Sequence, residues 1–269
     1  MRSALFIPPF DELADPILLA TLAAEAEQAG WDGVFLWDHI RWGRSVAVAD
    51  PWIALAAIAV ATERIRIGPM ITPLARRRPV KVARETVTLD RLSNGRLTLG
   101  AGLGTDWLAS ELSTTGEELD DRVRAEMLDE SLSILTRAWT GKKVSHHGAH
   151  YVVDGMAFLP RPVQRPGIPI WTAGFSGNRK PLRRAARYDG YCTVDVPHPD
   201  ELAEMVHTLG ELRAGEGRAD TPFDVAVSLS VGTDPRPYAE AGATWWLVEL
   251  AGSGLTARKV RSVIRNGPA

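Results

Sequence analysis

The stretch PVKVARETVTLDRLSNGRLTLGAGLG, residues 79–104, contains the unit that decides the fold. Residues 79–93 predict a helix, because the segment begins with proline and ends at Asn94-Gly95, a pair typical of a left-handed helix cap. Residues 96–101 predict a short strand, which runs directly into the glycines at positions 100, 102 and 104. Helix, cap, strand and glycine-rich turn follow one another without a spacer, which indicates an α/β protein.

The same alternation of strand and helix extends from this stretch in both directions. Short apolar segments predict eight strands, at residues 4–8, 33–38, 65–71, 96–101, 168–172, 190–195, 223–231 and 244–249. Several of them are apolar throughout, which is typical of parallel strands that are buried on both faces. Amphipathic segments predict the helices, at residues 16–30, 51–62, 79–93, 117–139, 178–188, 199–214, 235–241 and 255–265.

Eight strands that are each followed by a helix predict a single (β/α)8 barrel that occupies residues 1–269 as one domain. The longest gap lies between strands four and five. It includes residues 142–167, which we interpret as an insertion at the active end of the barrel, with a small hairpin of residues 144–145 and 151–153. The alternative is a doubly wound open sheet. Its glycine fingerprint would follow the first strand, where this chain has Pro8-Pro9-Phe10.

Composition and charge exclude several classes of protein. A net charge of −2, from 31 basic and 33 acidic residues, leaves no basic surplus for a nucleic-acid backbone. The longest apolar run, residues 52–62, is shorter than the roughly 20 residues that cross a bilayer. Cys192 is the only cysteine, so the chain cannot form an intramolecular disulfide. With an N-terminal apolar segment stopped by two prolines, these features predict a cytoplasmic protein without a nucleic-acid or membrane partner.

Chemistry in such a barrel belongs at the carboxyl ends of the strands. The second strand ends in Trp37-Asp38-His39-Ile40-Arg41-Trp42, which places a carboxylate, an imidazole and two indoles together. His39 could exchange a proton near neutral pH or contact a ring ligand. The alternative is a capping Asp38 beside a structural His39. The position at a strand end favours function.

Glycines mark two more strand ends. Gly100 to Gly104 resembles a phosphate cradle, or permits a flat ligand to approach the barrel mouth closely. The fifth strand leads into a second turn of small residues, which consists of Gly174, Phe175, Ser176, Gly177 and Asn178. Backbone amides and a helix dipole converge there, which favours phosphate binding over a plain connecting turn.

Four other features have simpler interpretations. His146-His147-Gly148-Ala149-His150 is interpreted as a solvated hairpin, and no metal site is predicted. The run 76–78 of three arginines either meets an anionic ligand tail or forms a solvated charge run. Cys192 is predicted to be an inert buried thiol. Among the nine tryptophans, we expect Trp37, Trp42, Trp107 and Trp171 at or near the mouth, and one of Trp245 and Trp246 inside the barrel.

Several segments, in order, resemble one family, the bacterial luciferase-like flavin or deazaflavin oxidoreductases. These segments are residues 30–39, 64–68 with 78–79, 88–96, 99–102, 160–170 and 184–190. They cover most of the chain. The resemblance implies a TIM barrel that binds FMN or coenzyme F420 at the carboxyl ends of its strands.

The resemblance also implies roles for individual residues. Asp38 and His39 match the Asp-His pair of members that use F420, in which the His serves in proton transfer, and Trp42 resembles a nearby indole. Asp38 is expected to orient His39 or to contact the cofactor. Met70-Ile71 falls where the family has a non-prolyl cis peptide behind the flavin ring. The further cofactor contacts that we expect are Thr72, Gly102, Gly104 and the phosphate-binding turn from Gly174 to Asn178.

One departure bears on the substrate. Sugar-phosphate dehydrogenases of this family carry a Glu after the glycines of the fourth strand, whereas this chain has Leu103-Gly104-Thr105-Asp106. We therefore expect hydride transfer or monooxygenation of another small organic substrate, with reduced F420 or FMN. The alternatives are a non-catalytic flavin-binding barrel and a phosphate-sugar enzyme without flavin. A homodimer is expected, partly from the resemblance and partly because two-fold dimers are the commonest assembly.

Overall fold

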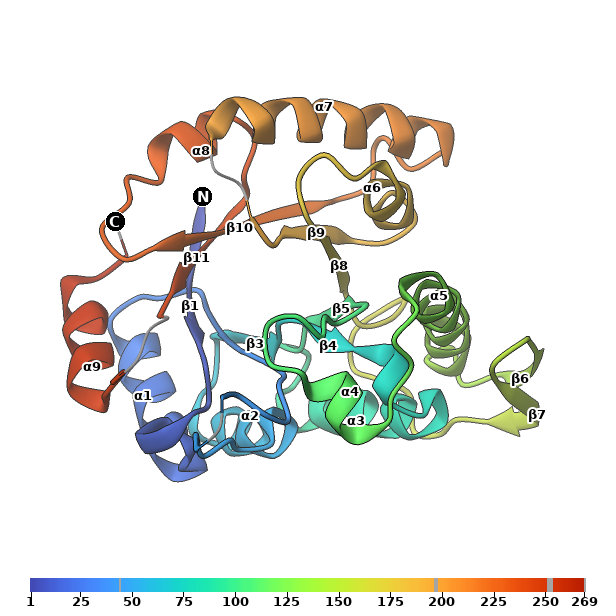
Figure 1. The fold of residues 1–269 in the computed structure, drawn as a ribbon, viewed down its shortest axis with the longest axis horizontal. Helices are drawn as coiled ribbons and strands as arrows, with labels where there is room; N and C mark the ends of the chain where they lie inside the picture. Colours follow the sequence, from blue (N-terminus) through green and yellow to red (C-terminus); the bar gives the residue numbers. More distant parts are fainter. Residues whose placement is uncertain (44, 196–197, 251–253, 269) are drawn as a thin grey trace.

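Nine parallel strands form one sheet that curls into a nearly closed barrel (Figure 1). The computed structural model describes residues 1–43, 45–195, 198–250 and 254–268. The strands are β1 (Arg2–Ile7), β2 (Gly33–Leu36), β3 (Arg66–Pro69), β4 (Thr72–Pro73), β5 (Leu99–Gly102), β8 (Ile170–Gly174), β9 (Gly190–Thr193), β10 (Asp224–Ser230) and β11 (Trp245–Glu249). Their order in the sheet is β3-β2-β1-β11-β10-β9-β8-β5-β4.

The two ends of this sheet belong to one segment of the chain. β3 pairs with β2 and β4 pairs with β5, and a bridge between Ile67 and Leu97 joins the two ends. The third strand therefore consists of two short pieces with different neighbours: β3 lies within the predicted residues 65–71, and β4 follows beyond them at residues 72–73. With these pieces counted as one strand, the predicted (β/α)8 barrel is confirmed.

Helices surround the strands (Figure 1). They are α1 (Pro16–Gln28), α2 (Pro51–Ala61), α3 (Pro79–Leu92), α4 (Glu111–Thr115), α5 (Asp121–Ala138), α6 (Arg179–Ala185), α7 (Pro199–Gly215), α8 (Arg236–Glu240) and α9 (Ala257–Asn266), with 3-10 turns at Asp11–Ala14 and Leu74–Arg76. The starts of α1 and α2 follow from local chemistry, because Asp15 and Asp50 accept hydrogen bonds from first-turn amides and proline follows each. The predicted helix at 117–139 begins later, at Asp121, and α4 precedes it as an element the sequence did not predict.

The interior of the barrel is filled by side chains. Phe35, Trp171 and Trp245 lie within 5.8 Å of one another by ring centroids, and Cys192 and Met70 pack beside them. Trp245 therefore points into the barrel, whereas Trp246 packs in the layer between strands and helices, as the alternation of a strand predicts. Trp171 is buried in this interior layer rather than at the mouth, where the sequence had suggested it.

An antiparallel hairpin, β6 (Lys143–His147) and β7 (Val152–Ala157), lies between α5 and β8 in the chain. It packs on α5, where Arg137 donates to Nδ1 of His146 and the Nε2 of that ring contacts Glu130. These contacts place the hairpin beside α5 (Figure 1), so the expectation that it lies at the active end of the barrel is not confirmed. Within the described residues, no helix has the length and apolar character needed to cross a membrane.

Candidate active site

The side chain of His39 lies in a group of aromatic rings at the carboxyl ends of β1 and β2. Its ring centroid is 4.9 Å from that of Trp42 and 5.9 Å from that of Trp37. Phe10 stacks on Trp42 at 5.4 Å, and Phe6 contacts Trp37 at 5.5 Å. The side chain of His39 keeps 17% of its surface exposed. Three residues that the sequence singled out, at positions 37, 39 and 42, therefore meet. The imidazole among them is partly exposed to solvent.

Asp38 points away from this group. Its carboxylate is buried and accepts hydrogen bonds from Thr72 Oγ1 at 2.7 Å and Trp52 Nε1 at 3.1 Å. Arg76 donates to Oδ1 at 2.7 Å, and Arg77 lies 3.2 Å from both oxygens. Among the described residues, no hydrogen bond joins Asp38 to His39. Asp38 therefore ties β2 to α2, β4 and the following turn, and the expectation that it orients the imidazole does not match the geometry.

The partner of His39 is Glu111, the first residue of α4, which the sequence analysis missed. Glu111 Oε1 lies 2.9 Å from His39 Nδ1, and Oε2 accepts the backbone N–H of Ile40 at 2.9 Å. Arg76 Nη1 lies 3.1 Å from Oε2. Burial raises the pKa of Glu111, but hydrogen bonds from His39 and Ile40 and the charges of His39 and Arg76 outweigh it and hold this pKa below the ordinary value for a glutamate. The carboxylate is therefore ionised at neutral pH.

Two of the three arginines in the run differ from both interpretations of the sequence, whereas Arg78 is exposed. The side chains of Arg76 and Arg77 are only 5% and 17% exposed, and both are paired with Asp38. Arg77 also lies over the ring of Trp52, with its guanidinium carbon 5.4 Å from the centroid. They form neither a solvated charge run nor a free cationic surface for a ligand tail.

The segment between β3 and β4 has the backbone geometry that the family resemblance implies, because the Met70–Ile71 peptide bond is cis. The glycines of β5 and of the turn after it fit closely against this segment. A Cβ atom at Gly102 would lie 2.7 Å from Ile71 Cγ2, and one at Gly104, where φ is +73°, would lie 2.8 Å from Pro73 Cβ. These glycines are therefore required by contacts within the protein, where the sequence had suggested close approach of a ligand.

The predicted phosphate-binding turn lies at the carboxyl end of β8, before α6. Phe175 is partly exposed, Gly177 has a φ of +78°, and the amide of Ser176 donates to Asp195 Oδ1 at 3.3 Å. Asn178, which precedes α6, makes no side-chain cap hydrogen bond. The turn is thus an exposed loop at the expected end of the barrel.

Apolar and polar side chains lie side by side at the mouth. Phe6, Ile71 and Ala173 are half-buried above the filled interior and form an apolar floor. Ser228 Oγ donates to Glu249 Oε2 at 3.1 Å at the ends of β10 and β11, a polar pair that the sequence analysis did not single out. The buried Nε1 of Trp37 has no acceptor in the part of the chain that the structure describes. Thr72 is less available than expected, since its hydroxyl already donates to Asp38.

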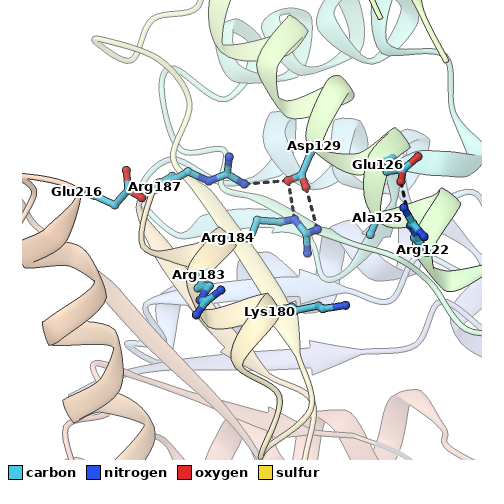
Figure 2. Close-up of a pocket in the computed structure, with 9 residues that line it drawn as sticks. All are labelled: Arg122, Ala125, Glu126, Asp129, Lys180, Arg183, Arg184, Arg187 and Glu216. Carbon is cyan, nitrogen blue, oxygen red and sulfur yellow. Dashed lines mark hydrogen bonds and ion pairs between the residues drawn. The ribbon is translucent and has the colours of Figure 1, made fainter. Parts of the chain in front are cut away.

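Two cavities lie outside the mouth. One, of about 400 Å³, lies between α5 and α6 and is lined mainly by charged side chains (Figure 2). In it, Asp129 accepts from Arg184 at 2.8 Å and from Arg187 at 2.9 Å. The other, of about 600 Å³, lies between the start of α7 and α8. Neither is lined by a residue that the sequence predicted for the site, so the candidate active site remains the aromatic mouth around His39.

Comparison with known proteins identifies the family. The model of luciferase-like monooxygenases matches residues 13–261. This chain belongs to the luciferase-like monooxygenase family. Within that family, the F420-dependent glucose-6-phosphate dehydrogenase of Microbacterium testaceum is 31% identical over 244 residues, which are 88% of this chain and 70% of the relative. The resemblance drawn from the sequence is thereby confirmed.

Solved structures of similar shape support the fold of this luciferase-like chain. An F420-dependent secondary alcohol dehydrogenase, in complex with an F420-acetone adduct, superposes with a TM-score of 0.82 at 19% identity and covers 98% of this chain and 96% of its own. A diketocamphane monooxygenase component from Pseudomonas putida, in complex with FMN, has a TM-score of 0.70 at 21% identity and covers 86% of this chain and 67% of its own.

Proposed function

We propose that this luciferase-like protein is an oxidoreductase that uses F420 or FMN at the barrel mouth to oxidise or reduce a small organic substrate. One observation carries the proposal. His39 lies partly exposed among Phe10, Trp37 and Trp42, in a chain 31% identical to a protein named as an F420-dependent dehydrogenase. Hydride transfer with F420 is the reaction we favour, and monooxygenation with FMN is the alternative.

Each residue of the mouth has its own proposed role. When bound, F420 or FMN would supply a ring atom that gives or takes a hydride, and FMN would also permit reaction with oxygen. His39 would exchange the proton that accompanies this transfer, and Trp42 would form the adjacent wall. The cofactor contacts that we propose are Met70, Ile71, Thr72, Gly102 and Gly104 behind the ring, and Gly174, Phe175, Ser176, Gly177 and Asn178 around the phosphate. Asp38 would act only by anchoring the loop that carries His39.

A sugar phosphate is a poor candidate for the substrate. The charges of Arg76 and Arg77 are already balanced, since both are paired with Asp38 and Arg76 is also paired with Glu111. The nearest side chains in the mouth are aromatic, and Leu103 stands after the fourth-strand glycines. We therefore propose a small alcohol or carbonyl compound with apolar substituents. The buried lone Cys192 is compatible with the reducing cytoplasm, where we propose that the enzyme works.

The first experiment is a titration of the purified protein with FMN and, separately, with F420, followed by absorbance. Tight binding of F420 with turnover of an alcohol would support the favoured reaction. Binding of FMN alone would redirect the proposal to monooxygenation, and binding of neither would overturn it. The variant His39→Ala should bind cofactor normally and lose turnover by about 10²–10⁴-fold. His207→Ala, on the exposed face of α7, is the matched control and should behave as wild type.

We also propose a homodimer formed through α2. This helix is apolar on all sides, yet Ile53 and Val60 are 67% and 73% exposed, and Ile17 of the adjacent α1 is 76% exposed. A helix that is hydrophobic all round is normally buried, so a second copy would cover this face. Light scattering should give twice the chain mass for wild type and the single mass for Ile53→Asp with Val60→Asp. A monomeric wild type would contradict this proposal.

A further inference from the structure

The two oxygens of the Glu111 carboxylate contact different groups. Oε1 faces Nδ1 of His39 at 2.9 Å. Oε2 accepts the backbone N–H of Ile40 at 2.9 Å and lies 3.1 Å from Nη1 of Arg76. Both groups at Oε2 can only donate hydrogen bonds, so this position must hold an acceptor. The carboxylate therefore has a fixed orientation relative to the imidazole.

The guanidinium of Arg76 is itself fixed. Its Nη2 donates to Oδ1 of Asp38 at 2.7 Å and to the backbone carbonyl of Asp38 at 3.1 Å. Asp38 is held in turn by Thr72 and Trp52. The side chains of Glu111, Arg76 and Asp38 are at most 5% exposed. Rotation of the carboxylate would break its hydrogen bonds with His39 and Ile40 and its ion pair with Arg76.

We propose that Glu111 is the positioning residue of His39, which holds the ring proton on Nδ1 and so leaves Nε2 to exchange a proton with the substrate. This inference rests on the proposed function of His39. An ionised carboxylate can only accept, so the hydrogen in the contact belongs to Nδ1 of the imidazole. In the neutral ring, Nε2 then carries the lone pair.

The proton balance of the favoured reaction follows from this arrangement. When an alcohol is oxidised, the hydrogen on its carbon leaves with its electron pair as hydride to the oxidised cofactor, and Nε2 takes the hydroxyl proton. The imidazolium that forms is stabilised by the carboxylate of Glu111. In the reverse reaction, Nε2–H returns the proton to the carbonyl oxygen as hydride reaches its carbon.

The variant Glu111→Gln tests the assignment because the structure dictates how its amide must lie. Ile40 N–H and Arg76 still require an acceptor, so the amide oxygen should occupy the Oε2 position. The NH₂ group then faces Nδ1 of His39, which must accept, and the ring proton moves to Nε2. Nitrogen-15 NMR of histidine-labelled protein distinguishes the two tautomers without cofactor or substrate, and the signals of His39 are those missing from His39→Ala.

We expect the Nδ1–H tautomer in wild type at a pH where the ring is neutral, and the Nε2–H tautomer in Glu111→Gln. Glu118→Gln, an exposed change in the same segment, should keep the wild-type tautomer. An Nε2–H tautomer in wild type, or no change in Glu111→Gln, would overturn the inference, and the wild-type measurement decides even where the variant fails to fold. Turnover of folded Glu111→Gln should fall by about 10²–10⁴-fold. A switched tautomer with unchanged turnover would support the positioning and refute the proposed role of His39.

Discussion

The substitution Asp38→Asn should strongly destabilise the protein, because Asp38 is the anion at the centre of a buried cluster. Its side chain has no exposed surface, and those of Arg76 and Arg77 are 5% and 17% exposed. Every group directed at its carboxylate is a donor: the indole N–H of Trp52, the hydroxyl of Thr72 and the two guanidinium groups. The NH₂ of an asparagine would therefore face another donor, and the charge that balances the arginines would be lost.

Removal of one partner from a buried ion pair costs about 3–5 kcal/mol of the free energy of unfolding. For a chain of roughly this size, 1 kcal/mol shifts the melting temperature by about 2–4 °C. Asp38→Asn should therefore lower the melting temperature by about 6–20 °C in calorimetry or circular dichroism.

The matched control is Asp50→Asn, the same chemical change at the start of α2. Asp50 accepts the amides of Trp52 and Ile53 at 2.9 and 3.0 Å, and asparagine caps a helix about as well as aspartate. This control should shift the melting temperature by no more than about 2 °C. If Asp38→Asn shifted it no further than the control, the ion cluster would not contribute to stability, and the anchoring role of Asp38 would be wrong.

Three further predictions concern Trp52, Glu111 and Cys192. Trp52→Phe should cost about 1–3 kcal/mol in thermal unfolding, since it removes the indole donor 3.1 Å from Asp38, whereas Trp107→Phe, at a 74% exposed position, should be neutral. The pKa of Glu111 is lower in the folded chain than in the unfolded chain, so its contribution to stability is present above the unfolded pKa and is lost as pH falls through the lowered folded pKa. Glu111→Gln should flatten this acid dependence of the melting temperature, and an unchanged slope would contradict the prediction. Burial, and secondarily the charge of Glu249, raises the pKa of Cys192 to about 12, so a thiol reagent should react only after denaturant is added, and stoichiometric labelling of the native protein would refute this.

The sequence predicted the barrel because its signals are local. The caps at Asp15 and Asp50 and the turn at Asn94 and Gly95, where φ is +52° and +83°, depend only on neighbouring residues. The separate strand β4, which follows the predicted strand of residues 65–71, could not be predicted, because it depends on which strand lies beside that segment.

The partial success at the site has a related cause. A search for polar residues at strand ends found His39, since a residue's place along one strand follows from periodicity. The search could not show that Glu111, and not Asp38, contacts His39. Asp38 is adjacent to His39 in the chain but turned away from it. Glu111 is 72 positions away and contacts it. α4, which carries Glu111, has five residues and no strong periodicity, and Ser110 before it has a φ of +51°. The group that we propose exchanges a proton is thus visible in the sequence, whereas the group that we propose orients it lies after another strand and becomes visible only when the barrel closes.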